Sequence, residues 1–323
     1  MDVSYPPHGL GEGIFKDTKL MAYAAKILAD SISPQGHRLV TFEVTYPLIV
    51  HAEFIRHRDL SYSVQSNRAM PTKKVIEAVM EDPFVPERWP INQKGMQAQE
   101  YYEEDSKEAN RSREVWLQSR DNAVQSVRQM TQGDWIFGSL HVHKQIANRL
   151  LSPFQWVTKV VSGTRFSNFF ALRDHEDAQP ELAKIARMMR ELYEANEPRL
   201  IRPAHIPLMG SDWHLPYVTD DDFRTVFNTL IGTDKGGCQE QAEILKKLSV
   251  ARCARVSYLK HPTDDKPATP ATIEEDIALC EKLAASGHWS PFEHVATPHE
   301  IPHQDGNFYG WHQMRKDYPN ECR

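Results

Sequence analysis

Basic and hydroxyl side chains are concentrated in residues 54–68. Arg56, His57 and Arg58 are followed, after seven residues, by Ser66 and Arg68 on either side of an asparagine. The arginine fork matches phosphate or carboxylate oxygens, and a serine hydroxyl adds a short hydrogen-bond donor. A histidine between two arginines has its charged form disfavoured, so we expect His57 to be neutral at pH 7. The spacing indicates an anion-binding site; the alternative is a solvated basic helix end without a ligand.

A second candidate is residues 287–294, Gly-His-Trp-Ser-Pro-Phe-Glu-His. A glycine-histidine turn precedes a predicted capping box at Ser290 and Glu293, with Pro291 in the first helical turn. Free backbone N–H groups at such a helix start favour an anion or the edge of a ring. A purely structural capping box is the alternative.

The elements expected to position the basic segment are a strand and a short helix. Residues 37–46 alternate apolar and polar side chains, which is typical of a half-buried strand ending at Pro47. Pro47 suits the first turn of a helix that continues through Ile55, so the basic residues lie at its C-terminal end and in the loop beyond. Other helices are predicted at 17–31, from a capping Thr72 to about 79, and at 98–130, 141–151, 178–192, 219–231, 239–250, 272–286 and 308–316, with an ordered loop at 82–96 and an extended segment at 296–301. Many helices and few strands favour an α+β fold.

Composition narrows the function. The 323 residues carry a net charge of −6, so no global positive field favours nucleic acid or a membrane. Tyr101, Tyr102 and Trp116 could stack on bases, but their acidic neighbours disfavour it. No apolar run approaches the roughly 20 residues that span a bilayer. The first residues show no export signal, so we expect a cytoplasmic protein.

Cysteine and histidine spacing does not indicate a metal site. The four cysteines (Cys238, Cys253, Cys280 and Cys322) contain no CxxC pair, and Cys253 and Cys280 lie on apolar helical patterns as core fillers. His141-Val142-His143 places its histidines on different faces of a helix, without a carboxylate at ligand spacing. Glycine-rich nucleotide loops and the nucleophile elbow are also missing from the sequence.

Together, these segments resemble the flavin-dependent thymidylate synthase family. Its signature (RHR, seven residues, Ser-x-Arg) is matched by residues 56–58 and 66–68. Similar segments are 149–153 (RLLSP), 168–173 (NFFALR) with 178–179 behind it, 254–258 (ARVSY) and 287–294. The resemblance covers roughly residues 37–71, 140–195 and 250–301, whereas 82–135 and 198–247 look like additions.

The order of the segments departs from that of the family. The ARVSY and GH-x-S/T-PFEH segments normally precede RHR and here follow it, as in a circular rearrangement that is similar to phage-encoded relatives. The resemblance implies a small, mostly antiparallel sheet. It also implies three regions: a flavin and nucleotide region at 1–197, a loop and helical insertion at 198–247, and a rearranged segment at 248–323 that completes the same catalytic domain. The proline-rich residues 198–218 mark the boundary.

The implied chemistry is reductive methylation of dUMP at carbon 5. Methylenetetrahydrofolate supplies the carbon, FAD relays the hydride, NADPH recharges the flavin, and the enzyme is a homotetramer with sites shared between subunits. No nucleophilic cysteine is needed, which agrees with cysteines that have no base spaced near them. The resemblance assigns FAD to Arg56, His57, Arg58, Asn168, His288 and Ser290, the dUMP phosphate to Ser66, Asn67, Arg68 and Arg149, and polarisation of the uracil ring to Arg173 as substrate-binding and catalytic residue.

Two residues depart from the family pattern. Val64 stands where a glutamate is usual, and Glu53 where a glutamine precedes RHR. Valine cannot accept a hydrogen bond, and a glutamate near a phosphate would repel it. Two alternatives therefore stay open: a dUMP hydroxymethylase of the same fold, and a non-catalytic nucleotide-binding homologue.

Overall fold

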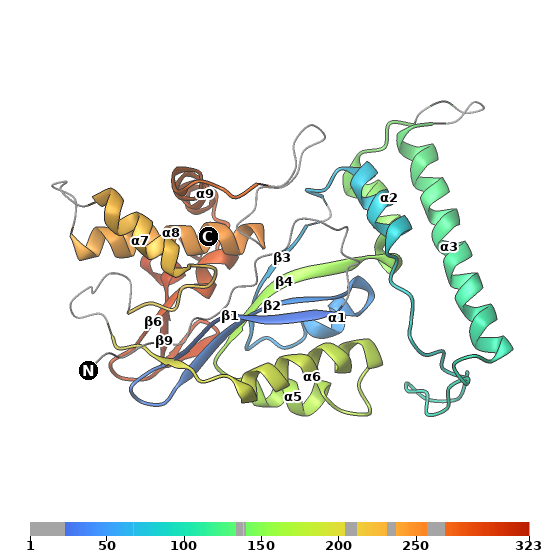
Figure 1. The fold of residues 1–323 in the computed structure, drawn as a ribbon, viewed down its shortest axis with the longest axis horizontal. Helices are drawn as coiled ribbons and strands as arrows, with labels where there is room; N and C mark the ends of the chain where they lie inside the picture. The colour runs from blue at the N-terminus through green and yellow to red at the C-terminus, as the bar shows by residue number, and fades with distance from the viewer. Residues whose placement is uncertain are drawn as a thin grey trace.

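The computed structural model describes residues 23–66, 68–133, 138, 140–203, 212–230, 237–256 and 269–322. At its centre lies a five-stranded sheet in the order β3-β4-β2-β1-β5 (Figure 1). The longer strands pair antiparallel, and the two-residue β5 runs parallel to β1. The predicted α+β class with a small, mostly antiparallel sheet is confirmed. The strands are β1 Ala24–Ile32, β2 Arg38–Pro47, β3 Ser61–Val64, β4 Trp156–Gly163 and β5 Arg199–Leu200.

The first strand replaces a predicted helix. β2 confirms the strand expected at 37–46, but β1 occupies the described part of the helix expected at 17–31; residues 17–22 lie outside the described residues. β1 and β2 form a hairpin whose turn contains Gly36 at φ 85°. A register shift between Ile27 and Ala29 leaves Leu28 as an extra residue. Such a bulge interrupts the two-residue alternation, so the apolar spacing imitates a helical stripe.

Two helices cover one face of the sheet, which we call the apolar face. They are α5 (Ser167–Arg173) and α6 (Pro180–Ala195), and α6 confirms the helix predicted at 178–192 (Figure 1). Phe42 of β2 and Val161 of β4 pack there against Ile185 of α6 in one buried cluster. The sequence pattern does not reveal β4, because the adjacent Val160 and Val161 break the two-residue alternation of a strand.

The opposite face of the sheet is covered by residues after 212. Val160 of β4 packs there against Tyr217 and Cys253, and Leu39 of β2 against Trp311. The helices predicted at 219–231, 239–250 and 272–286 are confirmed, as are the capping box at Thr272 and the core positions of Cys253 and Cys280. The elements are α7 Asp220–Leu230, α8 Cys238–Arg255, α9 Ile273–Ala285, the 3-10 turns η3 Ser290–His294 and η4 Met314–Asp317, and the strands β6 Ala296–Pro298, β7 Gln304–Asp305, β8 Phe308–Tyr309 and β9 Trp311–Gln313.

Two predictions for this part of the chain are wrong. Ser290 makes no capping hydrogen bond: residues 290–294 form a 3-10 turn whose N-cap is Trp289. The helix expected at 308–316 is instead two short strands and a 3-10 turn. Gly310 separates these strands at φ 79°, and the ring of His37 lies where its Cβ would be. This backbone conformation and contact favour glycine and end any helix.

Hydrogen-bonded side chains cross the face opposite α5 and α6, and we call them the polar stripe. Ser31, Thr41, Ser162 and Ser63 come from β1, β2, β4 and β3, in the order in which these strands lie in the sheet. His214 bridges Ser31 and Thr41 at 2.8 and 2.7 Å, and Thr41 contacts Ser162 at 2.5 Å. His294 bridges Ser162 and Ser63 at 2.7 and 3.0 Å. All six side chains are buried.

A third group of helices lies at the end of the sheet away from α7–α9 (Figure 1). The predicted loop at 82–96 is confirmed, but the helix expected at 98–130 begins only at residue 107, where Ser106 caps it. Thr72 begins its helix without capping it, since Pro71 is the N-cap. The helix expected at 141–151 begins at 144 and continues as a 3-10 turn past Pro153. These elements are α2 Thr72–Glu81, α3 Lys107–Thr131, α4 Lys144–Ala147 and η2 Asn148–Phe154.

Candidate functional site

The basic segment follows a short helix whose last residue is anchored in the core. After β2, the chain forms η1 (Leu48–Val50) and α1 (His51–Phe54), and Phe54 is fully buried. The basic residues therefore follow the helix end, as predicted. Residues 61–64, expected as loop, form strand β3 because they pair with β4. His57 is buried, whereas Arg56 and Arg58 are exposed.

The RHR pocket, a hollow of about 340 Å³, brings together most of the residues assigned to FAD. It is lined by Arg56, His57, Arg58, Asp59, Leu60, Arg165, Asn168, Phe169, Leu172 and Arg173. Asn168 and Arg173 come from the two ends of α5. Four arginines face one carboxylate, and Arg56 and Arg58 have no ion-pair or hydrogen-bond partner among the described residues. The pocket is therefore cationic and suits an anionic ligand.

Arg173 and His57 form the central contact of the RHR pocket. The Nε–H of Arg173 donates to Nε2 of His57 at 2.8 Å, and its Nη2 reaches the carbonyl oxygen of Glu53 at 3.4 Å. Nε2 must be unprotonated to accept, so His57 is the neutral tautomer with its proton on Nδ1. Burial, followed by the charges of Arg173 and Lys159, lowers the pKa of His57. The predicted neutral histidine agrees with this direction, but burial and Arg173 cause it rather than the flanking arginines.

A second hollow, which we call the Ser66 pocket, brings together the residues assigned to the dUMP phosphate. It measures about 410 Å³, and Ser66, Arg68 and Arg149 line it with exposed side chains. The predicted Asn67 lies outside the described residues. Arg173 does not line this pocket; it lies with the residues assigned to FAD.

His51 is a polar residue of the Ser66 pocket that sequence reasoning missed. His51 lies on α1, and its Nδ1 is 2.6 Å from the Tyr46 hydroxyl, which can donate to it. Burial lowers the pKa of His51 to about 4, so its ring is neutral and its Nε2–H can donate to a ligand. The sequence signal that could have identified His51 is its position one helical turn before Ile55, on the helix that leads into the basic segment. Arg165 of the RHR pocket was missed as well, since it belongs to no motif.

Two residues assigned to FAD lie elsewhere. His288 is exposed beyond α9, where its Nδ1 lies 2.8 Å from the Ser286 hydroxyl. Ser290 is exposed at the start of η3. Neither lines the RHR pocket or the Ser66 pocket of its own chain. Ser61 and Ser63, which share the basic segment with Ser66, are buried on the other face of the sheet and cannot reach a ligand.

The two departures from the family pattern have structural consequences. Val64 pairs with Lys159 in the β3–β4 ladder and packs against the apolar face. Lys159 is fully buried, its Nζ lies 3.2 Å from the centre of the Phe54 ring, and it has no hydrogen-bond partner in the described chain. Residues opposite each other in a ladder lie on the same face, so a glutamate at position 64 would lie beside this lysine. One carboxylate oxygen of Glu53, Oε2, is buried and makes no hydrogen bond to any described residue.

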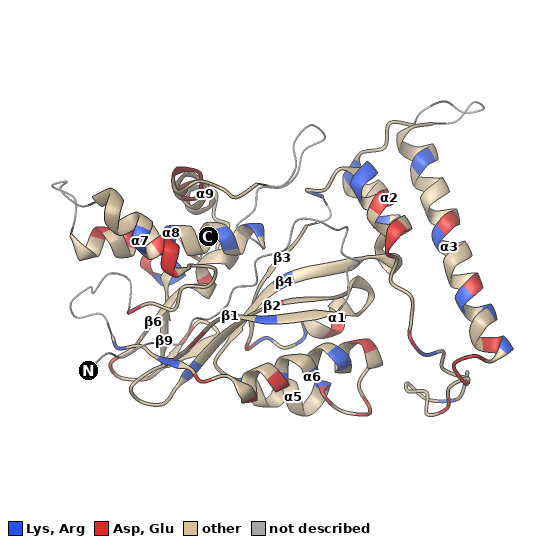
Figure 2. Cartoon of the chain, in the orientation of Figure 1, with Lys and Arg blue, Asp and Glu red and all other residues tan. Residues whose placement is uncertain are grey.

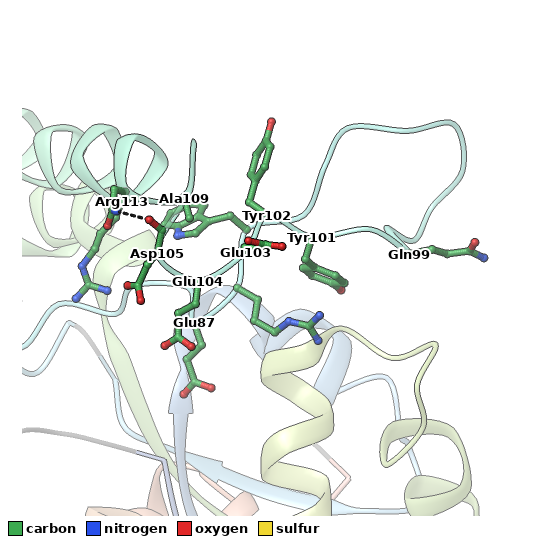
Figure 3. A pocket seen from close by; sticks show the side chains of 12 residues that line it. Glu87, Gln99, Tyr101, Tyr102, Glu103, Glu104, Asp105, Ala109 and Arg113 are labelled. Carbon is green, nitrogen blue, oxygen red and sulfur yellow. Dashed lines mark hydrogen bonds between the residues drawn. The ribbon is translucent and has the colours of Figure 1, made fainter. Parts of the chain in front are cut away.

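An acidic pocket lies apart from both hollows, beside the N-terminus of α3. Figure 3 shows Glu87, Glu103, Glu104 and Asp105 around it, with Tyr101 and Tyr102 nearby. Acidic side chains there disfavour a phosphate-bearing ligand. Figure 2 shows acidic and basic residues interspersed along α2 and α3, so these helices carry no extended basic face. No helix within the described ranges is long and apolar enough to cross a lipid bilayer.

The RHR pocket fits part of a dinucleotide such as FAD. Its unpaired guanidinium groups suit a diphosphate, and Asn168 supplies amide hydrogen bonds. At about 340 Å³ it is near the small end of ligand pockets, which range from about 300 to 1,000 Å³. One chain would therefore enclose only a portion of such a cofactor.

Comparisons with known proteins identify the family of the chain. No curated protein sequence matches the chain. Among solved structures, a UMP/dUMP methylase, PolB from Streptomyces cacaoi, bound with 5-Br UMP is 15% identical, with 53% of this chain and 89% of that chain covered and a TM-score of 0.43. The same enzyme bound with 5-Br dUMP is 16% identical, with 49% and 66% covered and a TM-score of 0.39. The family model described as "Thymidylate synthase complementing protein" matches residues 3–199, which include the RHR motif and Arg173. The chain belongs to the thymidylate synthase complementing protein family.

Proposed function

We propose that the protein transfers a one-carbon unit from methylenetetrahydrofolate to carbon 5 of dUMP, giving dTMP with FAD as cofactor and NADPH as reductant. The observation that carries this proposal is the pair of neighbouring pockets along residues 48–68, of which the RHR pocket is cationic and contains the Arg173–His57 contact. Bound FAD would supply the hydride that completes the methyl group. Family membership supports the same reaction.

The residues of the RHR pocket would bind and orient the reactants. Arg56, Arg58 and Asn168 would hold the cofactor diphosphate through charge-assisted hydrogen bonds. Neutral His57 fixes the guanidinium of Arg173 through its Nε. The Nη1 group of Arg173 makes no hydrogen bond to a described residue, so it would polarise the uracil ring where negative charge develops in the transition state.

The Ser66 pocket would bind the nucleotide phosphate. Ser66, Arg68 and Arg149 offer a hydroxyl and two guanidinium groups, and His51 adds a neutral donor. Because Arg173 lies in the other pocket, the uracil ring would extend toward the RHR pocket of the same or a neighbouring subunit. His288 and Ser290 lie outside both pockets, so we propose that they serve the site of a neighbouring subunit in a homotetramer.

Flavin binding and product identity test this proposal. Purified protein should show an absorption band at about 450 nm from bound flavin. With dUMP, methylenetetrahydrofolate and NADPH, mass spectrometry should identify dTMP. Colourless protein that gains no band on adding FAD would support the non-catalytic alternative instead.

Substitution of Arg173 tests the division of roles. Arg173→Ala should lower turnover about 100- to 1,000-fold, because one donor to the developing charge is lost. Its flavin band should remain, since the other cationic residues of the pocket are unchanged. Arg224→Ala, a surface arginine of α7 paired with Asp221, is the matched control and should leave turnover unchanged. Loss of flavin in Arg173→Ala would reassign this residue to cofactor binding.

Hydroxymethylation of dUMP is a second candidate. Val64 motivates it, because the family glutamate at this position is replaced by a side chain that accepts no hydrogen bond. The same assay separates the two products by the mass of one oxygen atom, and dTMP as the sole product would eliminate hydroxymethylation.

A further inference from the structure

Two histidines and an aspartate meet in the C-terminal part of the chain, outside both pockets. His299 follows β6, Asp305 ends β7 and His312 lies in β9. One ligand atom from each lies within 4.8 Å of the others. We call these three residues the His/Asp cluster. All three side chains are partly buried, with 16%, 15% and 29% of their surfaces exposed. An ion from solution could therefore reach them.

The separations of the ligand atoms fit one bound metal ion. Asp305 Oδ2 lies 2.9 Å from His312 Nδ1 and 3.4 Å from His299 Nε2. Ligands bound at about 2.1 Å and at octahedral or tetrahedral angles lie about 3.0 to 3.4 Å apart. Little movement of the side chains would be needed to bind an ion.

His312 is oriented by a second carboxylate, as metal-bound histidines commonly are. Its Nε2 lies 2.7 Å from Asp317 Oδ1 in η4. With the proton on Nε2 directed to Asp317, the lone pair of Nδ1 faces the carboxylate of Asp305. Two acceptors then face each other, and either a second proton or a cation must lie between them.

His299 provides a second observation that points to a metal ion at this cluster. Its Nε2 is buried and directed at Asp305, yet it makes no hydrogen bond to any described residue. The ring of His303 lies against it at a tilt of 35°, with centroids 3.8 Å apart, and restricts its rotation. Buried polar atoms normally make a hydrogen bond, so a buried imidazole nitrogen that faces a carboxylate oxygen at 3.4 Å without one is unusual.

We propose that His299, Asp305 and His312 bind one divalent transition-metal ion of the zinc class, with Asp317 as a positioning residue. Imidazole and carboxylate ligands together suit Zn²⁺, Co²⁺, Ni²⁺ and Fe²⁺ better than Ca²⁺ or Mg²⁺. The ammonium group of Lys316, which interacts electrostatically with Asp305, is held by Glu321 at 2.9 Å. The proposal does not depend on the proposed reaction.

The metal would stabilise a wall of the RHR pocket. The β7–β8 hairpin contains Asp305, and its Gln304 accepts a hydrogen bond from Arg165 of the pocket. On the next strand, the backbone N–H of Tyr309 donates to the Thr164 hydroxyl at 3.1 Å. An ion that joins the segment after β6 to β7 and β9 therefore holds the hairpin against Arg165.

Metal titration of the full-length protein tests the site. After chelator treatment and its removal, calorimetry with Zn²⁺ should give one tight site per chain. Co²⁺ bound to the wild-type protein should show the visible absorption of a nitrogen- and oxygen-ligated ion. This measurement needs no variant. Asp305→Asn, which keeps every histidine, should lose the tight site. Asp317→Asn should weaken binding about 10- to 100-fold.

The control is His175→Ala, which removes an exposed histidine 3.7 Å from Asp177 and should bind like the wild type. If Asp305→Asn does not fold, His299→Gln replaces it. Equal Zn²⁺ affinity and stoichiometry in wild type and folded Asp305→Asn, or wild-type protein without Co²⁺ absorption, would overturn the proposal and leave a proton between Asp305 and His312.

Discussion

The two faces of the central sheet are built on different principles. On the apolar face, side chains such as Phe42 and Val161 pack against α5 and α6 through apolar contacts. On the other face, the polar stripe joins four strands through His214 and His294. Apolar packing tolerates substitutions of similar volume, whereas a buried hydrogen-bond network requires each partner. The polar stripe therefore specifies how the C-terminal part of the chain docks on the sheet.

The hydrogen bonds of the polar stripe can all run in one direction. Ser31 donates to Nδ1 of His214, whose Nε2–H donates to Thr41; Thr41 donates to Ser162, which donates to Nδ1 of His294. The Nε2–H of His294 then donates to Ser63 at 3.0 Å. Each neutral histidine has one donor and one acceptor, and this arrangement uses both. A charged histidine would have two donors and break the chain.

The largest expected effect is therefore loss of stability in acid. Burial lowers the pKa of His214 and of His294 to about 3, against about 6.5 in the unfolded chain. Between these values the unfolded state binds more protons, so stability falls as pH decreases from about 6.5 toward 3. Each histidine should contribute about 1.4 kcal/mol per pH unit within this window.

Urea unfolding at several pH values measures this contribution. His294→Gln should reduce the pH slope of the unfolding free energy by about one proton between pH 6 and 4, values chosen to lie inside the window. An unchanged slope would mean that His294 is already charged in the folded protein.

Removing one histidine of the polar stripe should have the next largest effect. His294→Ala leaves a cavity and deprives Ser162 and Ser63 of partners, so the free energy of unfolding should fall by about 3 to 4 kcal/mol at pH 7. Chemical denaturation gives this value. His288→Ala, in the same segment but exposed, is the control and should change stability by less than about 0.5 kcal/mol.

The contrast between the faces also explains what the sequence predicted. The alternation of β2 identifies a strand because the apolar side chains of one face alternate with Thr41, Glu43 and Thr45 on the other. Both faces of β2 are covered, so the strand is not half-buried as predicted. The same reasoning fails for β1, where a bulge disturbs the alternation, and for β4, where the adjacent Val160 and Val161 break it. The hydrogen bonds of the polar stripe join residues up to 231 positions apart, and no local pattern encodes such contacts.

For the candidate site, the RHR signature predicted the binding motif. In the structure this motif lies beside Asn168 and Arg173, although more than 100 residues separate them in the sequence. The family resemblance provided this grouping, since spacing alone does not bring α5 to the RHR turn. His51, Arg165 and the His/Asp cluster were not predicted, because each depends on tertiary contacts. Whether His288 and Ser290 belong to the site of a neighbouring subunit stays a prediction.

Lys159 is the exception on the apolar face, and its removal should stabilise the protein. Its Nζ is surrounded by the rings of Phe54, Tyr62 and Tyr46 at 3.2, 4.3 and 5.2 Å. Burial lowers the pKa of Lys159 well below its usual value. Lys159→Met keeps the volume and removes a buried amine without a hydrogen bond, so the free energy of unfolding should rise by about 1 to 2 kcal/mol at pH 7.

The pH dependence of this variant provides a check. Unfolded Lys159 titrates near pH 10.4, above its folded pKa, so the wild type should gain stability as pH rises toward that value. The methionine variant should lack that gain. A variant less stable than wild type at pH 7 would show that the lysine is a favourable cation within its ring of aromatic side chains.

The smallest expected effect comes from restoring the family glutamate opposite Lys159. Val64→Glu places a carboxylate beside the amine in the β3–β4 ladder. Position 64 is only partly buried, so the new carboxylate keeps contact with water. Attraction and desolvation then oppose each other, and stability at pH 7 should change by less than about 1 kcal/mol. The pH slope is the sharper measurement: a paired Lys159 is protonated in the folded state, so the gain in stability above pH 7 should disappear. A slope like that of the wild type would mean that the new carboxylate points into the Ser66 pocket, which Val64 also lines, and leaves Lys159 unpaired.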